Sequence, residues 1–245
     1  MSASPPLRRA LVTGGSGDLG SAICRALAAG GYHVIVHGNQ SLNRAEAVVA
    51  AIRASGGSAQ AIAFDVTDAD ATRSALDGLL AAGSIHAVVN NAGIHDDAPL
   101  AGMRAEQWQR VIDVSLRGFF NVTQPLLLPM ARARFGRIVS IGSVAARLGN
   151  RGQTNYAAAK AALVGASKSL AREMASRGVT VNVVAPGVIA GRMADAAFPP
   201  ERIRDVVPAQ RAGTPEEVAA LVAFLCSDVA GYINGQVIGI NGGMG

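Results

Sequence analysis

The sequence predicts an α/β fold, a single doubly wound parallel sheet of the Rossmann type with helices on both faces. Short apolar runs without alternation, which are typical of strands buried on both sides, recur along the chain. Longer amphipathic patterns separate them, and this regular alternation of strand and helix is the signature of a parallel sheet. A glycine-rich turn also joins the first apolar run to the first helical pattern.

The expected elements follow one another through the whole chain. Strands are predicted at 11–13, 34–36, 61–64, 87–89, 138–141 and 179–184. Helices are predicted at 21–29, 43–54 and 70–80, with longer ones around 107–132 and 156–176. No linker, repeat or low-complexity segment interrupts them, so we expect residues 1–245 to form one domain, with two small domains as the alternative.

Composition restricts the function classes. Hydrophobic residues make up 50% and charged residues 16%, which is a globular composition. The net charge of +5 comes from scattered arginines without a basic run, so we expect no nucleic-acid partner. No stretch of 18 apolar residues appears, so no membrane span is expected. The apolar run near the N-terminus is too short to be the hydrophobic core of a signal peptide.

Cysteine and histidine spacing gives no sign of a metal or disulfide framework. Cys24 and Cys226 stand alone in helical patterns, which predicts core thiols in a reducing cytoplasm. The four histidines show no ligand spacing, so no metal site is expected.

The turn after the first strand is the candidate phosphate-binding site. A strand, a glycine turn and a helix in this order present backbone amides and a helix N-terminus to a pyrophosphate. The pattern alone is a weak signal, and an ordinary glycine-rich turn is the alternative. The candidate residues are Gly14, Ser16, Gly17, Asp18, Leu19 and Gly20.

The ends of the next strands indicate which dinucleotide binds. No carboxylate stands at 37–40 to hold a ribose 2'-hydroxyl, which favours NADP(H). His37, Asn39 and Arg44 are the candidate contacts of the 2'-phosphate. Asp65 and Val66 end the third strand, where a side chain can meet the adenine, although Asp65 is equally well interpreted as a turn residue.

Ser143, Tyr156 and Lys160 form the candidate catalytic group. Tyr156 and Lys160 are four residues apart, so in a helix both project from one face. An ammonium near a phenol lowers the phenol pKa, which predicts a tyrosine that serves as a general acid or base. Of the 22 basic residues only Lys160 and Lys168 are lysine, which favours a specific role for an ammonium at 160. The alternative is that all three residues are structural.

Taken in order, these motifs resemble the short-chain dehydrogenase/reductase family over nearly the whole chain. The motifs are the glycine turn, Asn90-Asn91-Ala92-Gly93, Ser143, Tyr156-x-x-x-Lys160 and Pro186-Gly187. Within the family the chain is most similar to bacterial 3-oxoacyl-acyl-carrier-protein reductases, through Gly136-Arg137-Ile138, Gly152 to Tyr156, Lys168 to Glu173, Val179 to Asn182 and Asn241 to Met244.

The resemblance implies a role for each site residue. Tyr156 would give the proton to a carbonyl oxygen, Ser143 would hold that oxygen, and Lys160 would bind the nicotinamide ribose and lower the pKa of Tyr156. The nicotinamide side would be lined by Asn91, Ala92 and Gly93 and by the loop with Pro186, Gly187 and Ile189.

The resemblance also implies partners. Arg134 and Arg177 match two arginines that grip acidic acyl carrier protein beside the active-site mouth, with plain surface charges as the alternative. A homotetramer is expected, with the helices around 107–132 and 156–176 at the interfaces. A small substrate lid is expected at about 188–212, and its part at 193–208 looks shorter than usual.

Four departures from the family pattern stand out. Asp18 replaces a glycine, so it should point away from the phosphates or cap the following helix. Gly17 stands where an arginine is common, which removes one cation expected near the 2'-phosphate. Ser115 replaces an asparagine that helps relay protons through water to the lysine. It remains a candidate catalytic residue if that role uses the backbone carbonyl, with simple helix packing as the alternative. Gly191 and Arg192 replace a threonine and an acidic residue.

The sequence therefore predicts an NADPH-dependent reductase of 3-oxoacyl thioesters on acyl carrier protein, acting in fatty acid elongation. A reductase of acetoacetyl-CoA or of another ketone is the first alternative. A catalytically weak NADP-binding regulatory protein is the second, since Asp18 and Ser115 depart from the pattern.

Overall fold

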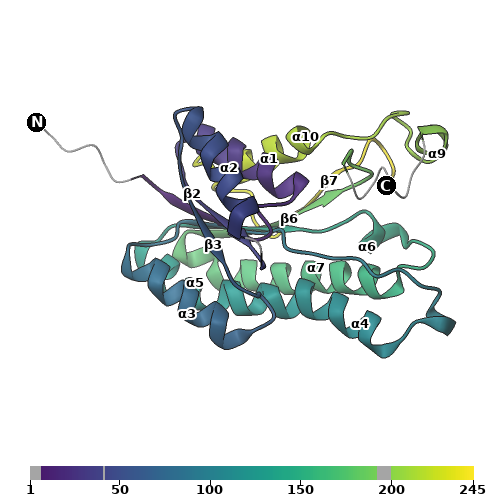
Figure 1. The fold of residues 1–245 in the computed structure, drawn as a ribbon, viewed down its shortest axis with the longest axis horizontal. Helices are drawn as coiled ribbons and strands as arrows, with labels where there is room; N and C mark the ends of the chain where they lie inside the picture. The colour runs from purple at the N-terminus through teal and green to yellow at the C-terminus, as the bar shows by residue number, and fades with distance from the viewer. Residues whose placement is uncertain (1–6, 41, 192–199) are drawn as a thin grey trace, which may run out of the picture.

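The computed structural model describes residues 7–40, 42–191 and 200–245, and it confirms the predicted α/β fold (Figure 1). A single sheet holds seven parallel strands in the order β3-β2-β1-β4-β5-β6-β7. The strands are β1 Arg9–Val12, β2 His33–Gly38, β3 Ser58–Ala63, β4 Ala87–Asn90, β5 Gly136–Ile141, β6 Val179–Pro186 and β7 Val237–Ile240. The strand order reverses between β1 and β4, and ligands bind at such a switch point in open α/β sheets.

Helices cover both faces of the sheet, as Figure 1 shows. On one face lie α1 Asp18–Ala29, α2 Leu42–Ala54 and α10 Pro215–Cys226. The other face carries α3 Ala69–Ala81, α4 Ala105–Ile112, α5 Gly118–Ala133 and α7 Thr154–Met174. The short helices α6 Ala145–Leu148 and α9 Pro200–Val206 belong to loops at the carboxyl edge. Two apolar clusters, one on each face, form the core.

Six of the seven strands overlap a predicted run, and β7 is the one that sequence reasoning missed. The residues of β7 are half-buried or exposed, because this strand lies at the edge of the sheet. An edge strand lacks the fully buried apolar run that marks the central strands. Its pairing with β6 nevertheless extends the sheet beneath the loop that follows Pro186.

The long helix predicted around 107–132 is interrupted. A π-helical turn, η2 Asp113–Arg117, separates α4 from α5, and the Gly118 amide bonds the carbonyl of Asp113 five residues back. Such π-turns are frequently found at functional sites. The predicted 156–176 helix is α7, followed by a 3-10 turn, η3 Ala175–Arg177.

Cys24 and Cys226 are free and buried, one in α1 and one in α10. Burial raises the pKa of both thiols, that of Cys226 to about 12. The prediction of core thiols is therefore confirmed.

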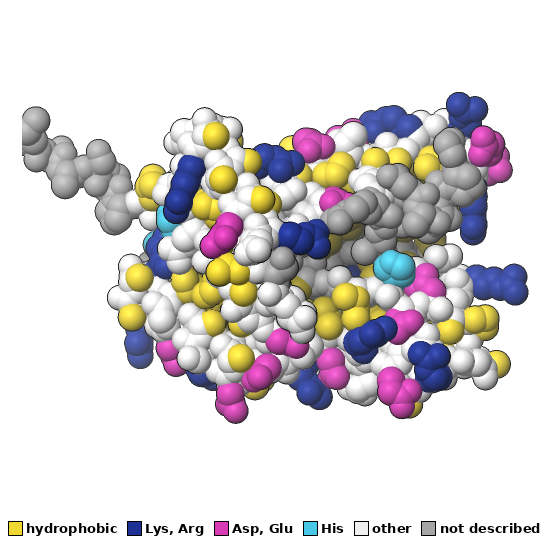
Figure 2. All heavy atoms as spheres, viewed as in Figure 1, with side chains coloured by type: hydrophobic (Ala, Val, Ile, Leu, Met, Phe, Trp, Pro, Cys, Tyr) yellow, Lys and Arg dark blue, Asp and Glu magenta, His cyan; other side chains and the backbone are white. Residues whose placement is uncertain are grey.

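The surface carries both signs of charge. On the face drawn in Figure 2, Lys and Arg side chains are dispersed and mixed with Asp and Glu. Within the described residues, no helix is long and apolar enough to cross a membrane, and no three His, Cys, Asp or Glu residues are grouped as metal ligands would be.

Candidate active site

The glycine turn connects β1 to α1 at the switch point of the sheet. Gly14 has a φ of +62°, a left-handed conformation that favours glycine, and a Cβ there would lie 3.0 Å from Nδ2 of Asn91. A Cβ on Gly20 would collide with the carbonyl oxygen of Gly14. These two positions accept only glycine, so the turn has the close backbone approach that a dinucleotide pyrophosphate needs.

Asn91 and Thr13 hold this turn against the end of β4. The Asn91 amide donates to the carbonyls of Thr13 (2.9 Å) and Gly14 (3.1 Å). The Thr13 hydroxyl accepts from the backbone N–H groups of Asn91 and Ala92, both at 3.0 Å. Asn91 thus positions the turn with its side chain rather than lining the nicotinamide side with it. Sequence reasoning passed over Thr13, although its place between strand and glycine turn is a signal for such a role.

Asp18 does not cap α1, contrary to one of the two expectations for it. Gly17 is the N-cap, and Asp18 is the exposed first residue of the helix. A carboxylate in the first turn is favoured by the helix dipole. Its Oδ2 lies 3.3 Å from the position that a Cβ on Gly191 would take. Leu19, the next residue, packs its side chain against the core.

His37 is not available to a 2'-phosphate, so that expectation is wrong. The side chain is 2% exposed. Its Nδ1 lies 3.0 Å from the Gly14 amide nitrogen, and its Nε2 lies 2.8 Å from the carbonyl oxygen of Phe64. The side chain at the end of β2 turns into the protein because both ring nitrogens find backbone partners there.

Arg44 is the cation that the structure places beside the turn. It lies on α2, and its Nη2 donates to the carbonyl of Ser16 at 3.2 Å from an exposed position. Asn39 is exposed at the end of β2. An exposed asparagine and a guanidinium beside the turn fit a ribose carrying a 2'-phosphate.

Asp65 and Val66 are both bound within the protein. Oδ1 of Asp65 accepts from the amide and hydroxyl of Thr67, both at 2.8 Å, so the turn interpretation of Asp65 describes this side chain. Val66 is buried, and its carbonyl accepts from Asn121 at 2.9 Å. Val66 could therefore contact an adenine only through its backbone N–H.

Lys160 lies buried on α7, one turn after Tyr156. Its Nζ donates to the carbonyl of Ile141, the last residue of β5, at 2.9 Å, and lies 5.6 Å from the Tyr156 ring centroid. Burial lowers the pKa of Lys160 to about 8. An ammonium has three donors and Ile141 takes one, so the remaining two suit the hydroxyls of a ribose. Gly93 borders this site, since a Cβ there would lie 3.3 Å from Nζ.

Tyr156 is partly buried, and its pKa is raised instead of lowered. Burial raises the pKa, a hydrogen bond from Ser143 lowers it, and the Asp97 carboxylate raises it. The predicted fall of the pKa is therefore wrong for this structure. The reason is that a buried phenol resists ionisation, and this effect of burial is larger than that of the Ser143 hydrogen bond. A raised pKa keeps the phenol protonated at neutral pH.

Ser143 follows β5 and faces the start of α6. Its Oγ accepts from the amide of Ala145 at 3.1 Å. Asn155, which sequence reasoning missed, fixes the start of α7. Its Oδ1 accepts from the Tyr156 amide at 2.8 Å, and its Nδ2 donates to the carbonyls of Asp96 (3.0 Å) and Gln107 (3.1 Å). A polar residue directly before the tyrosine was the signal.

Ser115 sits in the π-turn, which packs against α7. The serine is 3% exposed, and its Oγ has no hydrogen-bond partner within the described part of the chain. The π-turn breaks the α-helical hydrogen-bond pattern at this position, and such turns are frequently found at functional sites.

The loop after β6 closes the other side of the site. Pro186 ends β6, and the Gly187 amide donates to the carbonyl of Ile240 in β7 at 3.0 Å. A Cβ on Gly187 would lie 2.8 Å from Cα of Asn241, so the loop packs tightly there. Ile189 forms a bridge with Gly213. Of the expected lid at 188–212, residues 192–199, including Arg192, lie outside the described residues.

Arg134 and Arg177 lie together but not beside the active site of their own chain. Nη2 of Arg134 donates to the carbonyl of Ser176 at 3.2 Å. Arg177 belongs to η3, beyond the C-terminal end of α7, whereas Tyr156 lies in its first turn. At 1.5 Å per residue, about 27 Å of helix separates Tyr156 from Met174. The expectation that these arginines border the mouth of the same chain is wrong.

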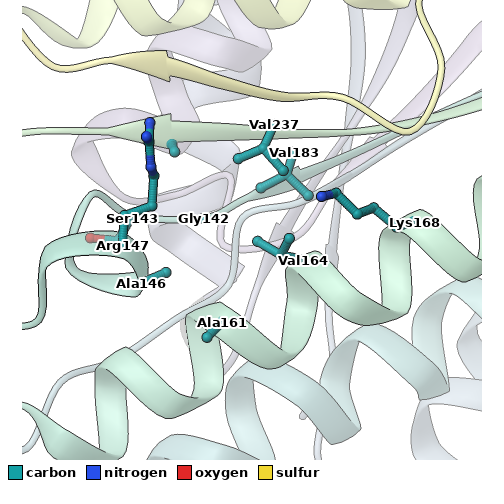
Figure 3. A pocket seen from close by; sticks show the side chains of 10 residues that line it. Gly142, Ser143, Ala146, Arg147, Ala161, Val164, Lys168, Val183 and Val237 are labelled. Carbon is teal, nitrogen blue, oxygen red and sulfur yellow. The ribbon is translucent and has the colours of Figure 1, made fainter. Parts of the chain in front are cut away.

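A cavity of about 250 Å³ lies behind Ser143 (Figure 3). Helices α6 and α7 and strands β6 and β7 supply its walls. They are mostly small and apolar, with the cations Arg147 and Lys168 on the lining. Of the candidate catalytic group, Ser143 lines this cavity, whereas Tyr156 and Lys160 do not.

Comparison with known proteins agrees with this geometry. The family model described as enoyl-(acyl carrier protein) reductase matches residues 16–245. The chain is 43% identical to a 3-oxoacyl-[acyl-carrier-protein] reductase of Aggregatibacter actinomycetemcomitans, over 96% of this chain and 98% of that protein. It is 47% identical to a protein of the same name from Synechocystis, over 96% of each.

A solved structure is also similar. The crystal structure of a putative gluconate dehydrogenase from Agrobacterium tumefaciens superimposes with a TM-score of 0.93 at 33% identity, covering 97% of this chain and 95% of that one. The solved structure agrees with the fold, and the family model and these relatives show that the chain belongs to the short-chain dehydrogenase/reductase family of oxidoreductases.

Proposed function

We propose that this enzyme reduces a 3-oxoacyl thioester on acyl carrier protein to the 3-hydroxyacyl form with NADPH, as in fatty acid elongation. The observation that carries the proposal is the buried Lys160 ammonium, which lies between the end of β5 and the Tyr156 ring at the edge where the glycine turn opens. The substrate class is supported by the names of the relatives at 43% and 47% identity.

The site residues divide the work of carbonyl reduction. When bound, NADPH supplies the hydride that the carbonyl carbon accepts. Tyr156 stays protonated because burial raises its pKa, and it donates its proton to the carbonyl oxygen, so that the C=O bond becomes a CH–OH group. Ser143 holds the same oxygen, and preorganised donors at a developing alkoxide lower the barrier. The Lys160 ammonium then stabilises the Tyr156 phenolate.

NADPH is favoured over NADH by the end of β2. Asn39 is exposed there, no carboxylate follows it at position 40, and the Arg44 guanidinium lies at the Ser16 carbonyl. A 2'-phosphate is an anion that a planar guanidinium binds well. We expect Arg44→Ala to raise the KM for NADPH about tenfold and to leave that for NADH unchanged, in steady-state assays with both cofactors.

A homotetramer in the cytoplasm completes the proposal. Phe120 and Leu128 on α5 are 62% and 66% exposed, and large apolar side chains in such positions are typical of interfaces. The free thiols of Cys24 and Cys226 fit a reducing compartment. Arg134 ends α5 and bonds Ser176 beyond the C-terminal end of α7, far from Tyr156 in the first turn of α7. A carrier docked on Arg134 and Arg177 would therefore serve the site of another subunit.

The deciding experiment compares acetoacetyl-carrier protein with acetoacetyl-CoA. We expect a higher kcat/KM for the carrier substrate, and a loss of about tenfold or more in Arg134→Ala and Arg177→Ala for that substrate alone. Arg132→Ala, a change at the same end of α5, is the control. Equal kcat/KM for both substrates, unaffected by these changes, favours the acyl-CoA or general ketone alternative. Binding of NADPH without any oxidation by a 3-ketoacyl thioester favours the regulatory alternative.

A further inference from the structure

The amide of Gly14 has no partner in the backbone hydrogen bonds of the sheet and bonds a side chain instead. Strand β1 pairs with β2 only as far as Val12, opposite Val36. The next amide, that of Thr13, still bonds the carbonyl of Val89 at 3.0 Å. At Gly14 the chain leaves the sheet with a φ of +62°, and its N–H meets Nδ1 of His37 at 3.0 Å.

The second nitrogen of His37 decides the protonation state of the ring. Nε2 lies 2.8 Å from the carbonyl oxygen of Phe64, which only accepts hydrogen bonds. Nε2 therefore carries the hydrogen, and Nδ1 accepts the Gly14 N–H with its lone pair. This pair of contacts requires a neutral imidazole in one tautomer.

The ring has little freedom to do anything else. It is buried, and its centroid lies 4.2 Å from that of the Phe64 ring at an angle of 51°. On the other side of the turn, Asn91 holds the carbonyl of Gly14. Both polar groups of Gly14 are thus fixed, its N–H by β2 and its C=O by the end of β4.

We propose that His37 is a positioning residue of the dinucleotide site: its neutral imidazole, anchored on Phe64, holds the Gly14 amide and so sets the shape of the turn that binds the cofactor pyrophosphate. The inference rests on the proposed dinucleotide site and adds to it a residue that does not touch the cofactor. It also makes cofactor binding sensitive to acid, because a protonated ring would point a second N–H at the Gly14 amide.

The surroundings of the His37 ring have opposite effects on its pKa. Burial lowers the pKa of His37, whereas the Phe64 carbonyl and the Asp65 carboxylate after β3 raise it. From α2, Arg44 reaches the Ser16 carbonyl of the same turn. From α1, Asp18 begins the helix that follows the turn, and from β4 the facing residue is the uncharged Asn91.

The test uses variants with and without the acceptor. In His37→Asn, Oδ1 takes the place of Nδ1 and does not titrate. In His37→Leu, no acceptor remains. His33→Asn is the matched control, since His33 lies on the same strand and bridges to Ser58 and Gln60 of β3 without touching the turn.

The first measurement is the Kd of NADPH and of NADH from pH 5 to 8. NADH is needed because a 2'-phosphate itself titrates near pH 6. We expect wild type and His33→Asn to lose affinity for both cofactors on acidification, by up to about tenfold per pH unit below the His37 pKa. His37→Asn should match wild type within about threefold at pH 8 and lose less in acid, and His37→Leu should bind about tenfold more weakly throughout.

The second measurement is the nitrogen-15 NMR spectrum of the His37 ring, assigned by its loss in His37→Asn. A neutral ring with hydrogen on Nε2 is expected at pH 7. Hydrogen on Nδ1, identical pH profiles for wild type and His37→Asn, or unchanged binding in His37→Leu would each overturn the proposal. Failure of the wild type to bind either cofactor would instead overturn the proposed function, and the NMR spectrum would still decide the state of His37.

Discussion

Oδ2 of Asp18 lies 3.3 Å from the place that a Cβ on Gly191 would occupy, so two departures from the family pattern meet in space. The family pattern has a glycine at the position of Asp18 and a threonine at the position of Gly191, so the small and the larger residue have changed places in this chain. The carboxylate thus stands against the backbone that lacks a side chain. Gly191 also has a φ of +142°, a backbone conformation that residues other than glycine rarely adopt.

The Asp18 and Gly191 pair should show coupling. We expect Gly191→Thr to raise the KM for NADPH, because its side chain would crowd Asp18, and we expect a smaller increase when Asp18→Gly is also present. Contacting residues typically couple by about 0.5–3 kcal/mol. A double-mutant cycle on the NADPH Kd measures this. Additive effects would show that backbone strain at 191 alone explains the loss.

Tyr156→Phe should remove turnover without removing cofactor binding. General acid catalysis is worth about 10²- to 10⁴-fold, so we expect a fall in kcat of that size with little change in Tm or NADPH Kd. Tyr32→Phe is the control, because it deletes a buried hydroxyl that bonds the Cys226 carbonyl at 2.6 Å, far along the chain from the catalytic group. That variant should lose about 1 kcal/mol of stability and keep its kcat. A Tyr156→Phe enzyme with near-normal kcat would contradict the assigned proton donor.

Lys160 should reduce the stability of the cofactor-free protein below pH 8. Its folded pKa is about 8 against 10.5 for an ordinary lysine, so the unfolded chain binds the proton more tightly between these values. Folding stability should therefore rise with pH from about 8 to about 10.5. The gain over Lys160→Met should be of the order of 3 kcal/mol across the whole range, of which about 2 kcal/mol falls between pH 7.5 and 9.5. Denaturant unfolding of both proteins at pH 7.5 and 9.5 measures it, and a constant difference would contradict the buried ammonium. Lys160→Met should also be inactive.

Ser115→Asn should leave activity intact or raise it. The asparagine restores the residue common in the family, and position 115 lies in the π-turn that packs against α7. Ser115→Ala is the control, and it should change Tm little because the serine Oγ has no partner in the described residues. Steady-state kcat of the three proteins decides the point. A large loss in Ser115→Asn would show that this enzyme uses a different proton path.

The fold and the placement of Tyr156 and Lys160 on one helix were predictable because their signals are local. Buried runs such as Val34 to Val36 mark central strands by composition alone, and the spacing of Tyr156 and Lys160 places both on one helix face. The half-buried edge strand Val237–Ile240 was not predicted because it lacks such a run. The π-turn at Asp113–Arg117 was not predicted because its residues continue the helical sequence pattern of their neighbours.

By itself the sequence determined the sheet, the glycine turn and the type of chemistry. Only the tertiary structure decided that His37 turns inward to Gly14, that Asp18 faces Gly191, and that Arg134 and Arg177 lie at the far end of α7 from Tyr156. It also decided that burial raises the pKa of Tyr156 against the expected effect of Lys160. The physical reason is that side-chain direction at strand ends, contacts between distant segments and the desolvation of ionisable groups depend on neighbours that local spacing does not specify.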